Sequence, residues 1–238
     1  MNLQELLDEL RGNMLRDVSD VLGEATDKLW TDATLVRYIN DGYRRFCRRT
    51  LLIRDASTEG VTQVTLEVGV DRYQLHKDVL AVLTARLEGK EYDLRKTTHD
   101  SLAGSVTNSD RAIVTSITPA NQEPRWFAMD EENRILRVSP NVGADFDGKI
   151  IQMRVARMPA ADLTVDDLNA ELEVDADYHL DILEWAAYRA LRNHDTDVEN
   201  IGKATSHKNR FNEAIAEAEK DSRRSMFAPV QFVFNSRW

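Results

Sequence analysis

One stretch of the chain has the spacing of a phosphate-binding loop. Residues 143–149 read GADFDGK, and a G-x-x-x-x-G-K loop cradles phosphates through its backbone N–H groups and its lysine. The surrounding residues do not fit that chemistry. Ile150 stands where a Ser or Thr would hold magnesium, and Asp145 and Asp147 would place negative charge against the phosphates. Because strand periodicity follows, we interpret Asp147-Gly148 as a hairpin turn.

The other residues that could do chemistry form no catalytic or metal-binding motif. The five histidines lack H-E-x-x-H spacing, and His194 beside Asp195 and Asp197 is interpreted as a helix-end pair. The acidic stretch 162–173 lacks the alternating ligands and the glycine of a calcium loop. Cys47 is the single cysteine, so neither an intramolecular disulfide nor a multi-cysteine zinc site is available. We expect Cys47 to be buried and inert, and we assign no enzyme activity, cofactor or metal.

The segment 29–54 predicts an amphipathic helix with arginines on one side. At about 100° per residue, one face carries the apolar set Leu35, Ile39, Gly42, Tyr43, Phe46 and Cys47, and the opposite face carries Arg37, Arg44, Arg45 and Arg48. Thr31 or Asp32 is expected to cap the helix. Asp41 precedes Arg44 and Arg45 by three and four residues, which is the spacing of intrahelical ion pairs.

We call Arg44, Arg45, Arg48 and Arg49 the arginine cluster. Like charges four residues apart repel, so an isolated helix gains nothing from this arrangement. Two interpretations stay open. The cluster is either a solvated face whose side-chain stems cover apolar neighbours, or a contact surface for a neighbouring subunit, a partner protein or nucleic acid.

Composition limits the class of protein. The chain has 238 residues, 42% of them hydrophobic, and a formal net charge of −10, which allows a substantial core. An acidic chain argues against a dedicated nucleic-acid binder, because phosphate contacts need a basic surface. No run of 18 apolar residues and no signal peptide is present, so we expect a soluble, non-secreted protein without a membrane partner.

The hydrophobic period changes twice along the chain. Helical spacing at residues 3–10 and 29–54 gives way to alternating strand patterns, which begin with Val61, Val64, Leu66 and Val68 and continue at 79–87, 112–117, 125–129, 135–138 and 149–155. Helical spacing returns at 178–194 and at Ala204, Phe211, Ile215, Ala218 and Ser222. Short connections favour antiparallel pairing. We predict an α+β protein with a helical bundle built from both chain ends (1–56 and 158–225) and a β-rich insertion (57–157).

The end of the chain differs from the rest. We expect residues 226–238 to form an extended arm, which is rich in large apolar side chains, namely Met226, Phe227, Val230, Phe232, Phe234 and Trp238. Such an arm either packs on its own domain or inserts into a partner. Between Arg157 and Arg189 the chain has nine acids and no Lys or Arg, which makes this acidic segment a candidate counterpart for the arginine cluster.

Several segments together resemble the head-to-tail adaptor proteins of tailed bacteriophages. The matching residues are Leu29-Trp30-Thr31-Asp32, Leu35, Tyr38, Ile39-Asn40-Asp41 and Arg44 to Arg49, then Arg157-Met158-Pro159 with Asp162-Leu163, and finally Tyr178-His179, Leu183, Trp185-Ala186, Tyr188-Arg189-Ala190 and His194-Asp195, with Ala204, His207 and Phe211 in the last helix. The resemblance covers both helical ends in order. The β insertion is similar in position and character.

This resemblance implies a structural virion protein at the head-tail junction, assembled in the host cytoplasm. Similar proteins form a ring, commonly a dodecamer, that docks to the portal protein ring, receives the tail or nozzle protein and passes double-stranded DNA. By position, residues 226–238 would reach into the portal, and the arginine cluster would contact a neighbouring subunit or the portal. A tail-associated peptidoglycan hydrolase and a DNA-binding regulator that uses the arginine helix are the alternatives.

Overall fold

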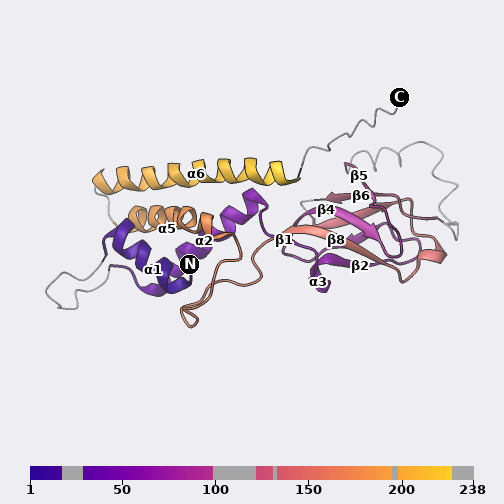
Figure 1. The fold of residues 1–238 in the computed structure, drawn as a ribbon, viewed down its shortest axis with the longest axis horizontal. Helices are drawn as coiled ribbons and strands as arrows, with labels where there is room; N and C mark the ends of the chain where they lie inside the picture. The colour runs from indigo at the N-terminus through magenta and orange to yellow at the C-terminus, as the bar shows by residue number, and fades with distance from the viewer. Residues whose placement is uncertain (18–28, 99–121, 131–132, 195–197, 227–238) are drawn as a thin grey trace, which may run out of the picture. The chain divides into compact units, whose positions relative to one another are not determined.

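The computed structural model describes residues 1–17, 29–98, 122–130, 133–194 and 198–226. The chain divides into two compact units: unit 1 comprises Met1–Leu52 and Ala161–Trp238, and unit 2 comprises Ile53–Ala160. Unit 1 contains the long helices and unit 2 the β-sheets (Figure 1). The predicted α+β class is confirmed. Compactness alone does not test independent folding, so the division into domains stays a prediction.

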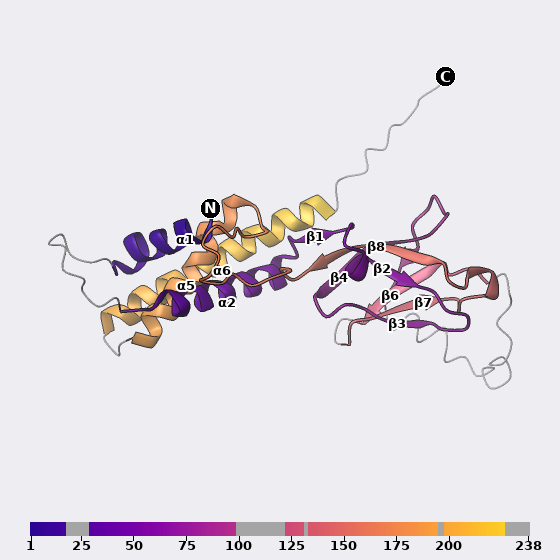
Figure 2. The same ribbon diagram turned by 90° about the horizontal axis from the view of Figure 1, so that it is seen from below.

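Unit 1 is a layer of helices in which α5 packs against both α2 and α6 (Figures 1 and 2). Its elements are α1 (Leu3–Glu9), the π-helical segment η1 (Leu10–Leu15), α2 (Asp32–Thr50), the 3-10 turn η3 (Ala176–Tyr178), α5 (His179–His194) and α6 (Val198–Met226). Helices α1 and α2 begin at side-chain caps. Asn2 and Glu5 form a capping box at α1, and the hydroxyl of Thr31 accepts a hydrogen bond from the Thr34 N–H at α2, as predicted.

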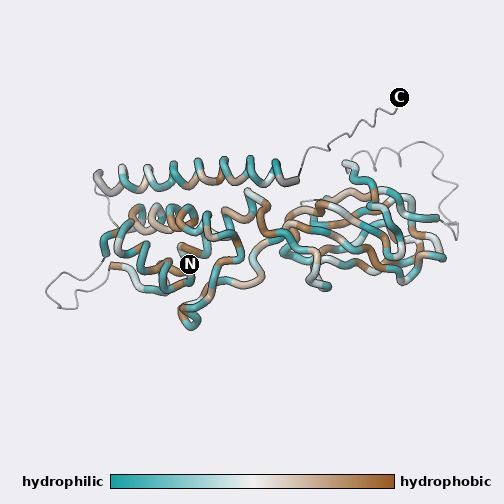
Figure 3. Tube along the Cα trace, viewed as in Figure 1, coloured by the Kyte–Doolittle hydropathy of each residue, from teal (hydrophilic) through white to brown (hydrophobic). Residues whose placement is uncertain are grey.

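Helix α5 is buried on most of its circumference, as its apolar composition predicts. Ile182, Leu183 and Ala187 are among its buried side chains. Leu180, in the first turn of the helix, is 47% exposed. The narrow stripe predicted on α6 is confirmed, since Ala204, Phe211, Ile215, Ala218 and Ser222 are all buried. The rest of α6 is mostly hydrophilic along its length (Figure 3).

In its described residues, unit 2 contains two four-stranded sheets. In the first sheet, β8 (Ile150–Arg157) pairs with β4 (Val79–Leu87) and also with β1 (Arg54–Asp55) and β2 (Gln63–Thr65). The second sheet has the order β3-β7-β6-β5, with the strands Arg72–Gln74, Ile135–Ser139, Trp126–Asp130 and Arg95–Lys96. Side chains from both sheets share one apolar core, which includes Leu66, Val82, Phe127, Leu136, Ile151 and Val155.

Three strand predictions need correction or lie outside the described residues. Val61 belongs to a short helix, α3 (Glu59–Thr62), rather than to a strand, because the carbonyl of Thr58 accepts the N–H groups of Val61 and Thr62. Among the described strands, pairing is antiparallel except between β5 and β6, which run parallel. The strand expected at 112–117 lies outside the described residues.

The Asp147-Gly148 turn does not form a hairpin. It follows a 3-10 turn, η2 (Ala144–Phe146), and connects β7 of one sheet to β8 of the other. Gly148 has φ +72°, which favours glycine, so the turn itself is correctly predicted. Its neighbours in the chain simply do not pair with each other.

Candidate partner-binding surface

The arginine cluster lies on the solvent side of α2, and the opposite side of this helix is buried. All six residues of the predicted apolar face are buried, whereas Arg44, Arg45, Arg48 and Arg49 are exposed. Together with Asp41, the four arginines line a shallow hollow of about 470 Å³. The residue pattern of α2 therefore presents a concave basic surface and anchors it on a rigid, packed helix.

The four arginines differ in their contacts with the rest of unit 1. The Arg45 guanidinium carbon lies 4.1 Å from the centroid of the Trp185 ring, a cation–π contact. Arg49 Nη2 lies 3.3 Å from Glu219 Oε1 of α6. Among the described residues, Arg48 has no hydrogen bond, ion pair or ring contact. Arg48 is thus the member of the cluster most available to a partner.

Arg44 is already paired with the acidic segment of its own chain. Its Nε and Nη2 donate to the two carboxylate oxygens of Asp162, both at 2.7 Å. The two side chains are 54% and 43% exposed, so water screens the pair and it adds little stability. This geometry accounts for one of the nine acids in the segment. The contact between neighbouring subunits stays a prediction.

Asp41 faces α5 instead of the arginines that follow it in α2. Its Oδ2 accepts hydrogen bonds from Trp185 Nε1 at 2.6 Å and from Arg189 Nη1 at 2.8 Å. The predicted intrahelical pairs with Arg44 and Arg45 are therefore wrong. A pair of that kind is worth only about 0.2–0.5 kcal/mol, less than a hydrogen bond from an indole to a carboxylate.

Asn40, which belongs to the adaptor resemblance, and its neighbours Gly42 and Tyr43 also hold unit 1 together. Asn40 makes two hydrogen bonds with the backbone of Leu163, at 2.8 and 3.0 Å. The Tyr43 hydroxyl accepts the N–H of Glu173 at 2.8 Å. Gly42 lies where a Cβ would be 3.0 Å from both the Ile182 carbonyl oxygen and Trp185 Cβ. Asn40, Gly42 and Tyr43 thus serve the packing of α2 against the acidic segment and α5.

The histidines do not assemble a catalytic or metal-binding site within the part of the chain that the structure describes. His207 Nδ1 lies 2.5 Å from Glu184 Oε2 in a mostly buried pair between α5 and α6. His179 Nε2 lies 3.1 Å from the Val174 carbonyl oxygen. The side chain of His194 and residues Asp195 and Asp197 lie outside the described residues. No group of three or more His, Cys, Asp or Glu there could hold a metal ion.

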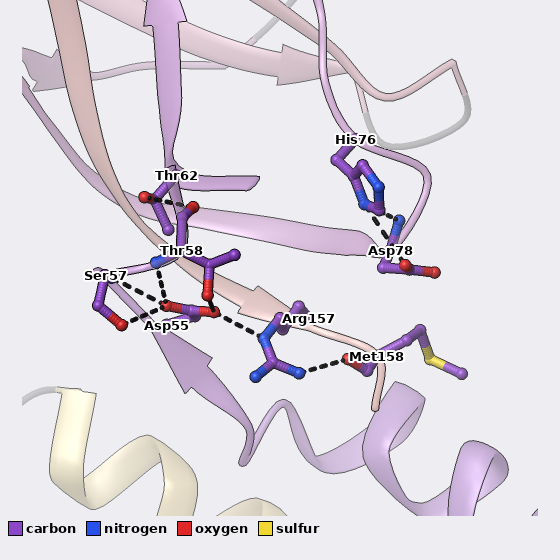
Figure 4. Close-up of polar contacts among 8 residues, drawn as sticks. All are labelled: Asp55, Ser57, Thr58, Thr62, His76, Asp78, Arg157 and Met158. Atoms are coloured by element: carbon purple, nitrogen blue, oxygen red, sulfur yellow. Dashed lines mark hydrogen bonds and ion pairs between the residues drawn. The ribbon is translucent and has the colours of Figure 1, made fainter. Parts of the chain in front are cut away.

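The sequence reading missed a buried carboxylate in unit 2, Asp55 (Figure 4). Asp55 accepts hydrogen bonds from the backbone N–H and hydroxyl groups of Ser57 and Thr58 and from Arg157 Nε at 2.8 Å. Burial raises the pKa of Asp55, but the hydrogen bonds together outweigh it and hold the pKa well below its usual value. The D-x-S-T spacing at 55–58 is the local signal that could have predicted this cap-like turn.

The apolar residues of the arm lie at the end of the described chain or beyond it. Phe227, Val230, Phe232, Phe234 and Trp238 are outside the described residues, and Met226 is the last residue of α6. Among the described helices, none is both long and apolar enough to cross a membrane.

The comparison that decides the family spans both units. The model of the SU10 adaptor protein family matches residues 1–232. The chain belongs to the SU10 adaptor protein family. The resemblance to phage head-to-tail adaptors is thereby confirmed, and a phage adaptor family indicates a structural protein of the head-tail junction. No curated protein matches the chain significantly.

Proposed function

We propose that this SU10 adaptor family member is a ring-forming structural protein that joins the portal to the tail or nozzle and lets the genome pass. The single observation that carries the proposal is the family match over residues 1–232, because it takes in unit 1, unit 2 and the first half of the arm. We propose no enzyme activity for the protein.

The geometry of unit 1 supports a binding role. Asn40 and Asp41, which belong to the adaptor resemblance, and the neighbouring Gly42 make contacts within unit 1. The arginine cluster beside them is exposed on the same helix. A closed ring needs two different faces on each subunit, because each copy contacts its two neighbours through unlike surfaces. An exposed basic surface on an acidic chain is a reasonable candidate for one of these faces.

We further propose that the arm, residues 226–238, inserts into the portal through Met226, Phe227, Val230, Phe232, Phe234 and Trp238. The support comes from sequence: after Pro229, Val230, Phe232 and Phe234 alternate with Gln231, Val233 and Asn235. This pattern suits an added strand or an anchor in a partner's groove. Helix α6 already buries one narrow stripe against its own unit. We therefore expect the apolar side chains of the arm to be buried in a partner protein and not against α6.

Co-sedimentation with assembled portal rings tests both proposals. Full-length protein is compared with a version that ends at Arg224 and with Phe232→Ser/Phe234→Ser, which keeps the length of the arm. We expect full-length protein to pellet with the portal and both variants to bind at least roughly tenfold more weakly, since buried aromatic anchors dominate such contacts. Equal binding by all three proteins would contradict the role of the arm. Absence of binding by the full-length protein would contradict the adaptor function.

The DNA-binding alternative is less well supported than the adaptor. Asp162 and Glu219 are paired with Arg44 and Arg49, so part of the positive charge of the cluster is neutralised within the chain. Affinity for DNA depends on the number of phosphate contacts and falls steeply with salt. Retardation of duplex DNA at physiological salt that is lost in Arg45→Ala/Arg48→Ala would favour the regulator over the adaptor.

A further inference from the structure

Unit 1 carries a second charged surface, made of carboxylates contributed by η3, α5 and α6. We call Asp177, Asp181, Glu217 and Asp221 the acidic flank. Asp177 and Asp181, like Glu217 and Asp221, are four residues apart and so lie on one side of the helical segment that carries them. Glu217 and Asp221 line one hollow of α6, and α5 packs against α6. Two pKa values agree with this placement. Burial, followed by the charges of Asp221, Asp175, Asp177 and Asp181, raises the pKa of the Tyr178 hydroxyl. Burial, followed by the charges of Glu184 and Glu217, raises the pKa of Asp181. The carboxylates therefore share one region and repel one another.

Positive charge compensates this region only partly: Lys220 and Arg224 line the same hollow of α6 as Glu213, Glu217 and Asp221. Glu184, beside the flank, is paired with His207 and lies 3.6 Å from Arg210. Asp221 Oδ1 lies 3.3 Å from Arg224 Nη1, whose side chain is 80% exposed. Within the described part of the chain, Asp177, Asp181 and Glu217 form no ion pair. A folded protein tolerates such uncompensated like charges at some cost in stability, which a cationic partner would remove.

The acidic flank and the arginine cluster lie on different sides of unit 1. On α6, the buried stripe formed by Phe211, Ile215, Ala218 and Ser222 separates two edges of the helix. At about 100° per residue, Glu219 lies on one side of the stripe, where it contacts Arg49 of the cluster. Glu217 and Asp221 lie on the other side, next to Asp181 and Tyr178. One rigid helical layer thus has a basic edge and an acidic edge.

We infer that the acidic flank of one copy is the binding partner of the arginine cluster of the next copy. This inference rests on the proposed ring. The partner of the acidic flank is a second copy of this chain, because one molecule carries both complementary surfaces on opposite edges. A heterologous, head-to-tail contact requires this arrangement. Charge complementarity of this kind also fixes the register of the subunits and disfavours like-to-like contacts.

A charge exchange between two unpaired side chains tests the inference. Arg48 and Glu217 are both exposed, and neither makes an ion pair or hydrogen bond among the described residues, so reversing them breaks no contact within the subunit. The variants are Arg48→Glu, Glu217→Arg and the double variant. Lys77→Glu, an exposed residue of unit 2, controls for the change in net charge. Circular dichroism checks that each variant is folded.

The measurement is the binding of full-length protein to assembled portal rings as its concentration is raised, at low and high salt. We expect Arg48→Glu and Glu217→Arg each to weaken cooperative filling of the ring by roughly tenfold or more, because like charges then face each other between copies. The first copy should still bind through its arm. Lys77→Glu should fill the ring like the wild type.

Rescue distinguishes a direct contact from a general effect. The double variant should fill the ring, and so should an equimolar mixture of the two single variants, because every junction in an alternating ring then joins opposite charges. If the single variants fill the ring normally, or if neither combination is rescued, the inferred contact is overturned while portal binding and the adaptor function stand. If wild-type protein does not bind the portal at all, both the inference and the proposed function fail.

Discussion

Asp41 and Trp185 join α2 to α5 through a hydrogen bond of 2.6 Å between the carboxylate and the indole N–H. The same indole ring lies under the guanidinium of Arg45. One aromatic side chain therefore holds both an acid that stabilises the helical layer and an arginine of the exposed cluster. Changes at Asp41 should affect stability first and the position of the cluster second.

Asp41→Ala should lower the free energy of unfolding by about 1 kcal/mol, because two charge-assisted hydrogen bonds are lost from a carboxylate that is 40% exposed and so partly screened. Urea denaturation followed by circular dichroism measures the change. Asp166→Ala, an exposed acid of the same unit, is the control and should be nearly neutral. An equal effect of both substitutions would contradict the role given to Asp41.

Gly42→Ala should destabilise unit 1 by about 1–3 kcal/mol, because the added Cβ would lie 3.0 Å from a backbone carbonyl oxygen of α5 that cannot turn away. Gly202→Ala in α6 is the matched control. A Cβ there meets nothing within 4 Å, so alanine should stabilise the helix by about 0.5–1 kcal/mol. The two substitutions should shift the thermal unfolding midpoint in opposite directions, and a shift in the same direction would count against close packing at Gly42.

Asp55→Asn should make the free energy of unfolding less dependent on pH in the acidic range. The folded-state pKa of Asp55 lies below its unfolded value of about 3.9, so the carboxylate stabilises the folded chain above that pH, and its contribution is lost as the pH falls toward the folded-state pKa. The variant should be less stable by about 1–3 kcal/mol at pH 7. The difference from wild type should shrink below pH 4. Unfolding in urea at several pH values tests this, with Asp145→Asn as the exposed control.

Cys47 should react with a thiol reagent only when unit 1 opens. Its side chain is fully buried on the apolar face of α2, so the native rate of labelling reports local or global unfolding. We expect labelling in urea at least roughly a hundredfold faster than in buffer, and Gly42→Ala should raise the native rate. Rapid labelling of the wild-type protein in buffer would show that the α2–α5 interface is looser than described.

The long helices could be predicted from sequence because their hydrophobic period is strong. The apolar face of α2 and the stripe on α6 are buried as expected. Short elements were harder to predict, because a few local hydrogen bonds determine whether they form. At Val61, for example, the alternating pattern predicted a strand, but Thr58 caps a helical turn instead. The parallel pairing of β5 with β6 depends on the fold of the whole sheet and leaves no local pattern.

Polar partners were predicted less well than apolar faces. Spacing along α2 predicted ion pairs between Asp41 and Arg44 or Arg45, but Asp41 instead accepts hydrogen bonds from Trp185 and Arg189. Likewise, the charge pattern indicated the acidic segment as a counterpart of the arginine cluster, but nothing in the sequence selects Asp162, 118 positions away, as the partner of Arg44. Apolar burial follows from periodicity along one element, whereas a hydrogen bond between distant elements follows only from how those elements dock.

The hydrogen-bonded ladder between β1 and β8 has a consequence for the evolution of the chain. Arg54 pairs with Ala156, and the carbonyl of Ile53 accepts the N–H of Arg157, so the chain enters and leaves unit 2 at neighbouring points fastened by Asp55 and Arg157. A module whose two ends meet in this way can be exchanged, enlarged or trimmed without moving the ends it was attached to. Lineages of these phages could therefore diversify the β module while inheriting the helical layer unchanged.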